Sequence, residues 1–127
     1  MIDHVSIGVH DLAACGRFYE AVLVSLGYTR LVTRPGSIGF GKKYPEFWLN
    51  ERRAMTPADP DSGAHICLRA SSIEAVQAFH AAAMAAGATS DGPPGPRPEY
   101  SAGYYAAFVR DPEGNKIEAV TFTPGAR

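Results

Sequence analysis

The 127-residue sequence has little cysteine, no long apolar run and almost no excess of charge of either sign. Two cysteines, Cys15 and Cys67, are too few for the disulfide framework of a small secreted protein, so we expect a reduced, cytoplasmic chain. No stretch reaches the ~18 consecutive apolar residues of a membrane-spanning helix. Asp3 places a charge where a signal peptide needs apolar residues.

The balance of charge also bears on partners. Twelve basic residues face thirteen acidic ones, which leaves no electrostatic footprint for nucleic acid. The remaining composition, with 46% hydrophobic residues, is that of an ordinary globular protein, and the length fits one domain, residues 1–127.

The first part of the chain reads as a strand, a helix and three further strands. Residues 2–9 alternate between apolar and polar, which predicts a strand with His4 and Ser6 on one face. Asp11 is a suitable N-cap for a helix whose apolar residues recur at helical spacing until Gly27. Strand-like stretches follow at 28–33, 36–40 and 46–49.

The second part repeats this order. Residues 64–70 alternate as the first strand does, and Ser71 with Glu74 has the spacing of a capping box before a helix that Gly87 ends. The proline-rich segment 91–98 is interpreted as a stiff loop. Strands are expected near residue 88, at 104–110 and at 116–122, with a hairpin turn at 111–115.

The two parts align at a constant distance. His4 and His65 are 61 positions apart, and so are Phe18 and Phe79. A repeat of this length indicates two copies of one supersecondary unit and not a solenoid. The sequence therefore predicts an α+β fold of two β-α-β-β-β modules, residues 1–50 and 63–123, joined by a linker at 51–62.

Three side chains of this repeat suggest a metal site. His4 and His65 occupy equivalent positions on the first strands of the two modules, and Glu118 interrupts an otherwise mostly apolar last strand. Two imidazoles and one carboxylate can hold a divalent ion and leave positions open for substrate oxygens.

Taken singly, each residue has a simpler interpretation. A lone strand histidine is more often hydrogen-bonded or exposed than a metal ligand, and a lone glutamate on a final strand is usually solvated. The equivalence of the two histidines favours the metal site, although no local ligand motif supports it.

The chain also resembles a known superfamily. The resemblance rests on Ile2-Asp3-His4-Val5, on Ala64-His65-Ile66 and on the stretch from Tyr104 to Glu118, in which Asp111 to Glu118 has the pattern D-P-x-G-x-x-x-E. These residues resemble the vicinal oxygen chelate superfamily, which includes glyoxalase I, bleomycin-resistance proteins, fosfomycin-resistance proteins and extradiol dioxygenases. The resemblance implies paired βαβββ modules that form an open, curled mixed sheet, with a metal held in it by His4, His65 and Glu118.

The resemblance also marks a departure from glyoxalase I, whose fourth metal ligand is a second glutamate. Matching Ile117-Glu118 to the segment 46–50 places Phe47 or Trp48 at that position, with Glu46 one or two residues away. The missing carboxylate argues against a true lactoylglutathione lyase. A set of two histidines and one carboxylate is closer to that of the extradiol dioxygenases and fosfomycin-resistance enzymes.

Further residues are candidates for the pocket. A hydroxyl of Tyr104 or Tyr105 could assist Glu118 in catalysis, although neighbouring strand residues face opposite sides, so only one of the two can enter the cup. The candidates for substrate binding are Trp48, Phe47, Arg97, Tyr100 and Cys67.

Three functional hypotheses remain. The first is a metal-dependent enzyme that chelates neighbouring oxygens of a small molecule on zinc, nickel, manganese or iron. The second is a homodimeric protein that binds a drug or metabolite without chemistry, and the third is a relic without metal. Members of the superfamily often form dimers and exchange modules between chains, so His4 and His65 of one site can come from different subunits.

Overall fold

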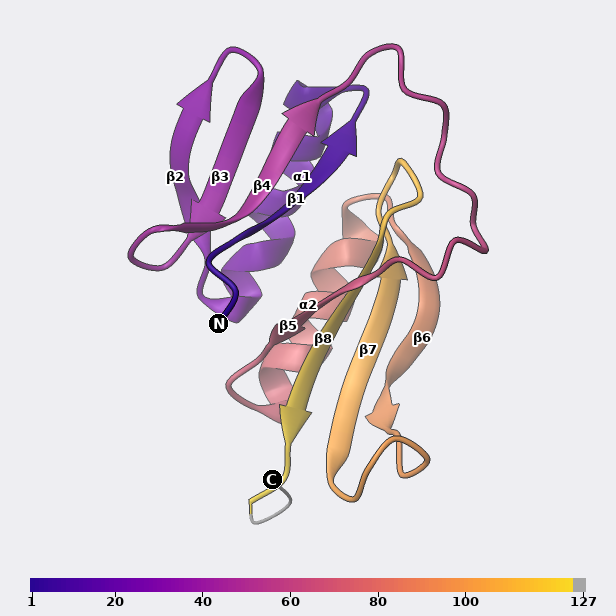
Figure 1. Cartoon of the computed structure of the whole chain (residues 1–127). Helices are drawn as coiled ribbons and strands as arrows, with labels where there is room; N and C mark the ends of the chain where they lie inside the picture. The colour runs from indigo at the N-terminus through magenta and orange to yellow at the C-terminus, as the bar shows by residue number, and fades with distance from the viewer. Residues whose placement is uncertain (125–127) are drawn as a thin grey trace.

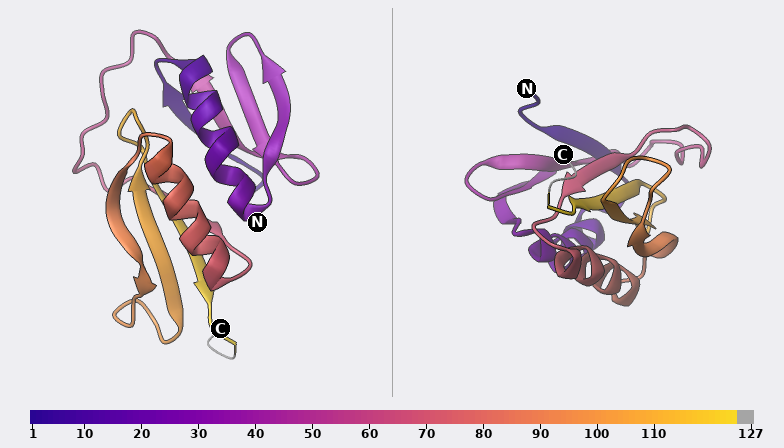
Figure 2. Two further views of the ribbon diagram at one scale, coloured as in Figure 1. Left: turned by 180° about the vertical axis from the view of Figure 1, so that it is seen from behind. Right: turned by 90° about the horizontal axis from the view of Figure 1, so that it is seen from below.

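The computed structural model describes residues 1–124, and these form two modules, each with a four-stranded sheet and one helix. Both sheets lie on one side of the molecule and both helices on the other (Figures 1 and 2). One face of each sheet is therefore covered by helices, and the other face is open. The two modules follow the predicted order of elements, so the predicted fold class is confirmed.

The first module ends at Glu51. Its elements are β1 (Val5–Val9), α1 (Leu12–Leu23), a short 3-10 turn η1 (Val24–Leu26), β2 (Thr29–Arg34), β3 (Ser37–Gly41) and β4 (Pro45–Glu51). Asp11 caps α1 as predicted, because its side chain accepts a hydrogen bond from the amide of Ala14. Gly27 takes a left-handed conformation after η1.

The second module begins after a linker without regular structure. Its elements are β5 (Ile66–Arg69), α2 (Ile73–Ala85), β6 (Thr89–Pro96), β7 (Tyr104–Arg110) and β8 (Lys116–Phe122). The strand orders of the two sheets, β1-β4-β3-β2 and β5-β8-β7-β6, are the same arrangement repeated. In each sheet the first strand pairs in parallel with the last, and the other pairs are antiparallel.

The helix-facing sides of the sheets and the two helices enclose one large core. Its largest fully buried side chains include Tyr19, Phe40, Phe47 and Phe79. This core follows from the alternation of apolar and polar residues in the sequence, since each strand turns every second side chain toward the helices. The other side chains lie on the open faces, where a second, smaller cluster surrounds Phe108.

Two details of the second module differ from the sequence predictions. Segment 91–98 was predicted as a loop, but residues 89–96 form β6. Its prolines are tolerated because β6 is an edge strand that pairs only with β7, with register shifts on both sides of Gly92. The cap of α2 is Ser72 and not Ser71, since the Ser72 hydroxyl accepts from the amide of Ala75.

The two sheets lie within the open architecture that was predicted, one in each module. No strand ladder joins them within residues 1–124. The turns of the first module differ in how closely they are packed. Between β3 and β4, for example, a Cβ added to Gly41 would overlap the carbonyl oxygen of Tyr44, whereas one added to Gly36 would meet nothing within 4 Å.

The β7–β8 turn, residues 111–115, braces the two modules. Tyr19 of α1 donates a hydrogen bond of 2.6 Å to Asp111, and both residues are buried. Glu113 accepts hydrogen bonds from the backbone amides of His10 and Asp11, directly before α1. A carboxylate is well placed at a helix N-terminus because the free amides and the helix dipole favour negative charge there.

Candidate functional site

The open face of the second sheet holds a connected group of polar side chains. His65 Nε2 lies 3.1 Å from Oε1 of Glu118, and the hydroxyl of Tyr104 donates to Oε2 of the same carboxylate. Glu118 is only 2% exposed, whereas the side chain of His65 is 41% exposed. Glu118 is therefore a nearly buried carboxylate with a partner on each oxygen, and one of these partners, His65, is accessible from solvent.

Sheet geometry explains this grouping. Cys67 of β5 pairs with Glu118 of β8, so these two side chains point to the same face. His65 precedes Cys67 by two residues and shares that face, as the alternation predicted. The Cys67 thiol lies beside Glu118 and Tyr104, and desolvation raises the pKa of Cys67 to about 12. The thiol is therefore protonated at neutral pH and is not a reactive thiolate.

Tyr104 acts as a hydrogen-bond donor in this group. Desolvation, and then its bond to Glu118, raise the pKa of the Tyr104 phenol well above its ordinary value. Tyr100 packs edge-on against Tyr104 with 5.2 Å between the ring centroids, and Phe108 lies 6.4 Å from the His65 ring. An aromatic ring thus lies beside each of Tyr104 and His65.

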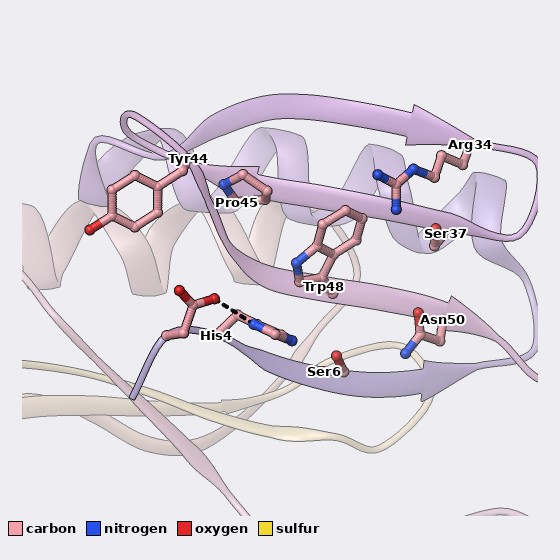
Figure 3. A pocket seen from close by; sticks show the side chains of 9 residues that line it. His4, Ser6, Arg34, Ser37, Tyr44, Pro45, Trp48 and Asn50 are labelled. Carbon is pink, nitrogen blue, oxygen red and sulfur yellow. Dashed lines mark hydrogen bonds and ion pairs between the residues drawn. The ribbon is translucent and has the colours of Figure 1, made fainter. Parts of the chain in front are cut away.

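His4 lies apart from this group, on the first module. Its Nδ1 is 2.7 Å from a carboxylate oxygen of Asp3, and its side chain is 52% exposed. It lines a hollow of about 480 Å³ on the open face of the first sheet (Figure 3). Within residues 1–124 of one chain, no three His, Cys, Asp or Glu side chains come together in a way that could hold a metal ion.

The two open faces correspond residue by residue. Val5 pairs with Phe47 as Ile66 pairs with Ile117, and Val5 and Ile66 are equivalent in the repeat. Trp48 therefore occupies the position equivalent to Glu118. The sequence alone did not decide whether Phe47 or Trp48 takes this position. Glu46 accepts a 2.7 Å hydrogen bond from Tyr28.

Phe47 is not a pocket residue, contrary to its prediction as substrate-binding. It is fully buried in the core, where its ring lies 5.0 Å from that of Tyr19. Tyr105 likewise faces the helices, because it packs against the main core and its hydroxyl accepts a hydrogen bond from Gln77 of α2. It therefore lies on the opposite side of the sheet from Glu118, and the prediction of a catalytic role for Tyr105 was wrong.

Arg97 is held by the protein itself. Its guanidinium donates to the carbonyl oxygens of Pro93, Gly95 and Pro96 and lies 5.5 Å from the Phe108 ring centroid. It is therefore part of the structure beside the site, with most of its donors already in use. Tyr100, by contrast, is 58% exposed at the edge of the same face.

The sequence interpretation missed most residues around Trp48. The hollow of the first sheet is lined by Arg34 of β2, Ser37 of β3, Tyr44 of the β3–β4 connection, and Pro45 and Asn50 of β4, besides Asp3, His4, Ser6 and Trp48. Alternation along β4 would have found Asn50, since it lies two residues from Trp48. Nothing local in the sequence indicates Arg34.

A smaller hollow of about 240 Å³ lies between the modules. It is lined by Ser6 and Ile7 of β1, by His65 and Ile66 at the start of β5, by parts of the linker, and by residues in and beside the β7–β8 turn. Ser6 borders both this hollow and the one on the first sheet. Neither helix has the length and apolar composition that crossing a bilayer requires, as far as residues 1–124 are concerned.

Comparisons with known proteins agree with this architecture. A glyoxalase/bleomycin resistance protein from Albidiferax ferrireducens T118 is 36% identical, with a TM-score of 0.84 over 94% of this chain and 98% of that one. A glyoxalase/bleomycin resistance protein/dioxygenase family enzyme from Burkholderia phytofirmans PsJN is 22% identical, with a TM-score of 0.72 over 93% and 95% of the two chains.

A fosfomycin resistance protein from Listeria monocytogenes shares the fold at 16% identity, with a TM-score of 0.71 over 98% of this chain and 94% of that one. The comparison with curated proteins finds no match. The sequence model of the Glyoxalase/Bleomycin resistance protein/Dioxygenase superfamily matches residues 1–119. With its duplicated modules and this match over nearly its whole length, the chain belongs to that superfamily.

Proposed function

We propose that this protein is a metal-dependent enzyme of the glyoxalase/dioxygenase type, in which His4, His65 and Glu118 hold a divalent ion that chelates neighbouring oxygens of a small molecule. The observation that carries the proposal is the pair formed by His65 and the buried Glu118 on the open face of the second sheet. Zinc, nickel, manganese and iron all suit these ligands.

The spacing of this pair fits two ligands of one ion. Two ligands about 2.1 Å from a metal and at right angles to each other lie about 3 Å apart. His65 Nε2 and Glu118 Oε1 are separated by 3.1 Å. A direct hydrogen bond between the imidazole and the carboxylate has the same length. The spacing therefore supports a shared ion but is not specific to it.

His4 has the arrangement expected of a third ligand. Metal-bound histidines commonly donate their other ring nitrogen to a carboxylate, which orients the ring. Asp3 occupies that place at Nδ1 of His4. Nε2 of His4 has no hydrogen-bond partner among residues 1–124.

The three ligands do not meet within one chain, so we place the complete site in a homodimer. His4 of one protomer would join His65 and Glu118 of its partner. A two-fold axis then creates two identical sites, because an isologous interface uses each surface twice.

The chain's own residues have defined tasks in this proposal. An ion bound there would supply positive charge to stabilise an oxyanion that develops on the substrate. Asp3 orients His4, and Tyr104 holds the Glu118 carboxylate by donating its hydroxyl hydrogen. Glu118 is our candidate for moving a substrate proton, since its carboxylate is nearly buried and lies beside the imidazole that would bind the same ion.

The alternative is a homodimeric drug- or metabolite-binding protein without chemistry. The hollow around Trp48 favours it, because an aromatic side chain stands where the equivalent position of the second module has a carboxylate. Both cysteines are free, which fits the reducing cytoplasm that we propose for either function.

Metal content tests the proposal. The untagged protein is purified and analysed by elemental analysis beside His65→Ala and a control, His80→Ala, whose imidazole instead contacts Ser90. We expect a stoichiometric divalent metal in the wild type and in the control, and its loss in His65→Ala. Equal metal content in all three proteins, or none in the wild type, would overturn the proposal.

A mixing experiment tests the shared site. His4→Ala and His65→Ala homodimers are each expected to lack metal. Unfolded together, refolded and supplied with the metal, they form heterodimers in which one site regains all three ligands, so roughly one site in four is restored. Ligands that all came from one chain would give no restoration.

A further inference from the structure

We propose that the hollow on the first sheet binds a small organic acid with a flat apolar body, and that Arg34 holds the acid group. This inference deepens the proposed function, because it names the substrate class of the same site. It rests on residues of β2, β3 and β4 that take no part in holding the ion.

Trp48 forms an apolar floor. Gly39 of β3 pairs with Trp48, and a Cβ at Gly39 would lie 3.0 Å from the indole and 2.9 Å from Cβ of Pro45. The indole therefore rests directly on the glycine backbone. In the second module the pair equivalent to Gly39 and Trp48 is Phe108 and Glu118. The aromatic side chain of the pair therefore lies on β4 in the first module and on β7 in the second. Only the first face has a broad ring in the place of a carboxylate.

Arg34 supplies the charge. Its guanidinium lies 5.1 Å from the Trp48 ring, and no carboxylate among residues 1–124 pairs with it. The side chain is exposed at the end of β2. A guanidinium stacked on an aromatic ring is held in place while its planar fork of N–H donors stays free for an anion. An acid group is thus the ligand that this side chain lacks.

The other lining residues fit the same ligand. Ser37 and Asn50 lie on the Arg34 side of the indole, and the indole lies between Arg34 and His4 (Figure 3). The hollow contains one carboxylate, that of Asp3, and this group is engaged by His4. A flat acid would place its acid group at Arg34, its body on Trp48 and its remaining oxygens toward His4.

Trp48 is the chain's single tryptophan, so its fluorescence reports directly on this hollow. Chelator-treated protein is titrated with benzoate, with phenylphosphonate and with benzamide, which has the same shape as benzoate without the charge. We expect at least one of the two acids to change the emission and to bind about tenfold more tightly than benzamide. The acid that binds more tightly distinguishes a carboxylate from a phosphonate substrate.

Variants assign the effect to Arg34. Arg34→Gln is expected to remove the preference for the acid, and Arg34→Lys to keep only part of it, because lysine has charge without the fork. Arg17→Gln, at an exposed position of α1, is the charge-matched control and is expected to bind as the wild type does.

Two results would overturn the inference: equal affinity for the acids and benzamide, or an unchanged preference in Arg34→Gln with a native circular dichroism spectrum. Failure of the metal proposal is seen separately. If the wild type contains no metal but the Arg34-dependent preference is present, the acid site stands and the metal site falls. If the metal is present and the preference is absent, the metal site stands and the acid site falls.

Discussion

Replacing Tyr19 with phenylalanine should weaken the brace between the two modules and nothing else. The Tyr19 hydroxyl donates a 2.6 Å hydrogen bond to Oδ2 of Asp111, and both residues are less than 5% exposed. Burial raises the pKa of Tyr19 well above its ordinary value, so the phenol remains a neutral donor. Phenylalanine fills the same space, and the change removes only the oxygen.

The size of the effect follows from the partners of Asp111. Its carboxylate keeps three other donors, the amides of Glu113 and Asn115 and the side-chain amide of Asn115. The loss is therefore that of one hydrogen bond to a charged group, about 2 kcal/mol of the free energy of unfolding. For a domain of this size, that lowers Tm by roughly 5–8 °C.

Urea unfolding measures this loss for the wild type, Tyr19→Phe and Tyr44→Phe. Tyr44 is 58% exposed, so its variant is the matched control and should stay within about 0.5 kcal/mol of the wild type. Asp111→Asn should cost more, because an amide has one acceptor oxygen where the carboxylate has two. A Tyr19→Phe protein as stable as the Tyr44→Phe control would show that the brace contributes nothing, and the argument from burial would be wrong.

Three further outcomes are expected. The pKa of His10 is raised from 6.5 by its bonds to the Met55 carbonyl and then to Glu113, so its stabilisation is complete below about pH 6.5 and is lost as the pH rises through the raised value. A plot of Tm against pH should therefore fall less steeply above neutrality in His10→Gln than in the wild type; parallel curves would contradict this. Ser72→Ala should lose about 1 kcal/mol in urea unfolding and Ser71→Ala almost nothing, and equal losses would mean that the cap is misassigned. Gly41→Ala should cost about 3 kcal/mol or prevent folding, whereas Gly36→Ala, which meets no neighbouring atom, should be close to neutral in the same assay.

The architecture could be predicted from the sequence because the repeat and the alternation agree. Two segments 61 residues apart share the same order of apolar residues, caps and turns, and each alternating strand assigns its own faces. Alternation also placed His65 and Cys67 on one side, where the structure has them beside Glu118. The failures were local. Segment 91–98 reads as a loop from its prolines, and only its edge position in the sheet makes a strand acceptable.

The candidate site was less predictable because it depends on contacts between distant strands. The alternation of side chains along a strand shows that only one of Phe47 and Trp48 can face the open side. Deciding which of the two does so requires the pairing register of β4 with β1. Arg34 reaches Trp48 from another strand, so no spacing in the sequence connects them. The separation of His4 from His65 depends on how the modules pack, which a repeat cannot specify; the metal ligand set stays a prediction.

The exchange of Trp48 for Glu118 between otherwise equivalent positions gives the two halves opposite characters. One half has an acidic group beside an imidazole, and the other has a broad hydrocarbon surface next to a cation. In the proposed dimer these unlike surfaces face each other, so a bound molecule meets a different chemistry at each end and can enter in one orientation only. Regioselectivity would then arise from the difference between two equivalent modules, without any additional domain.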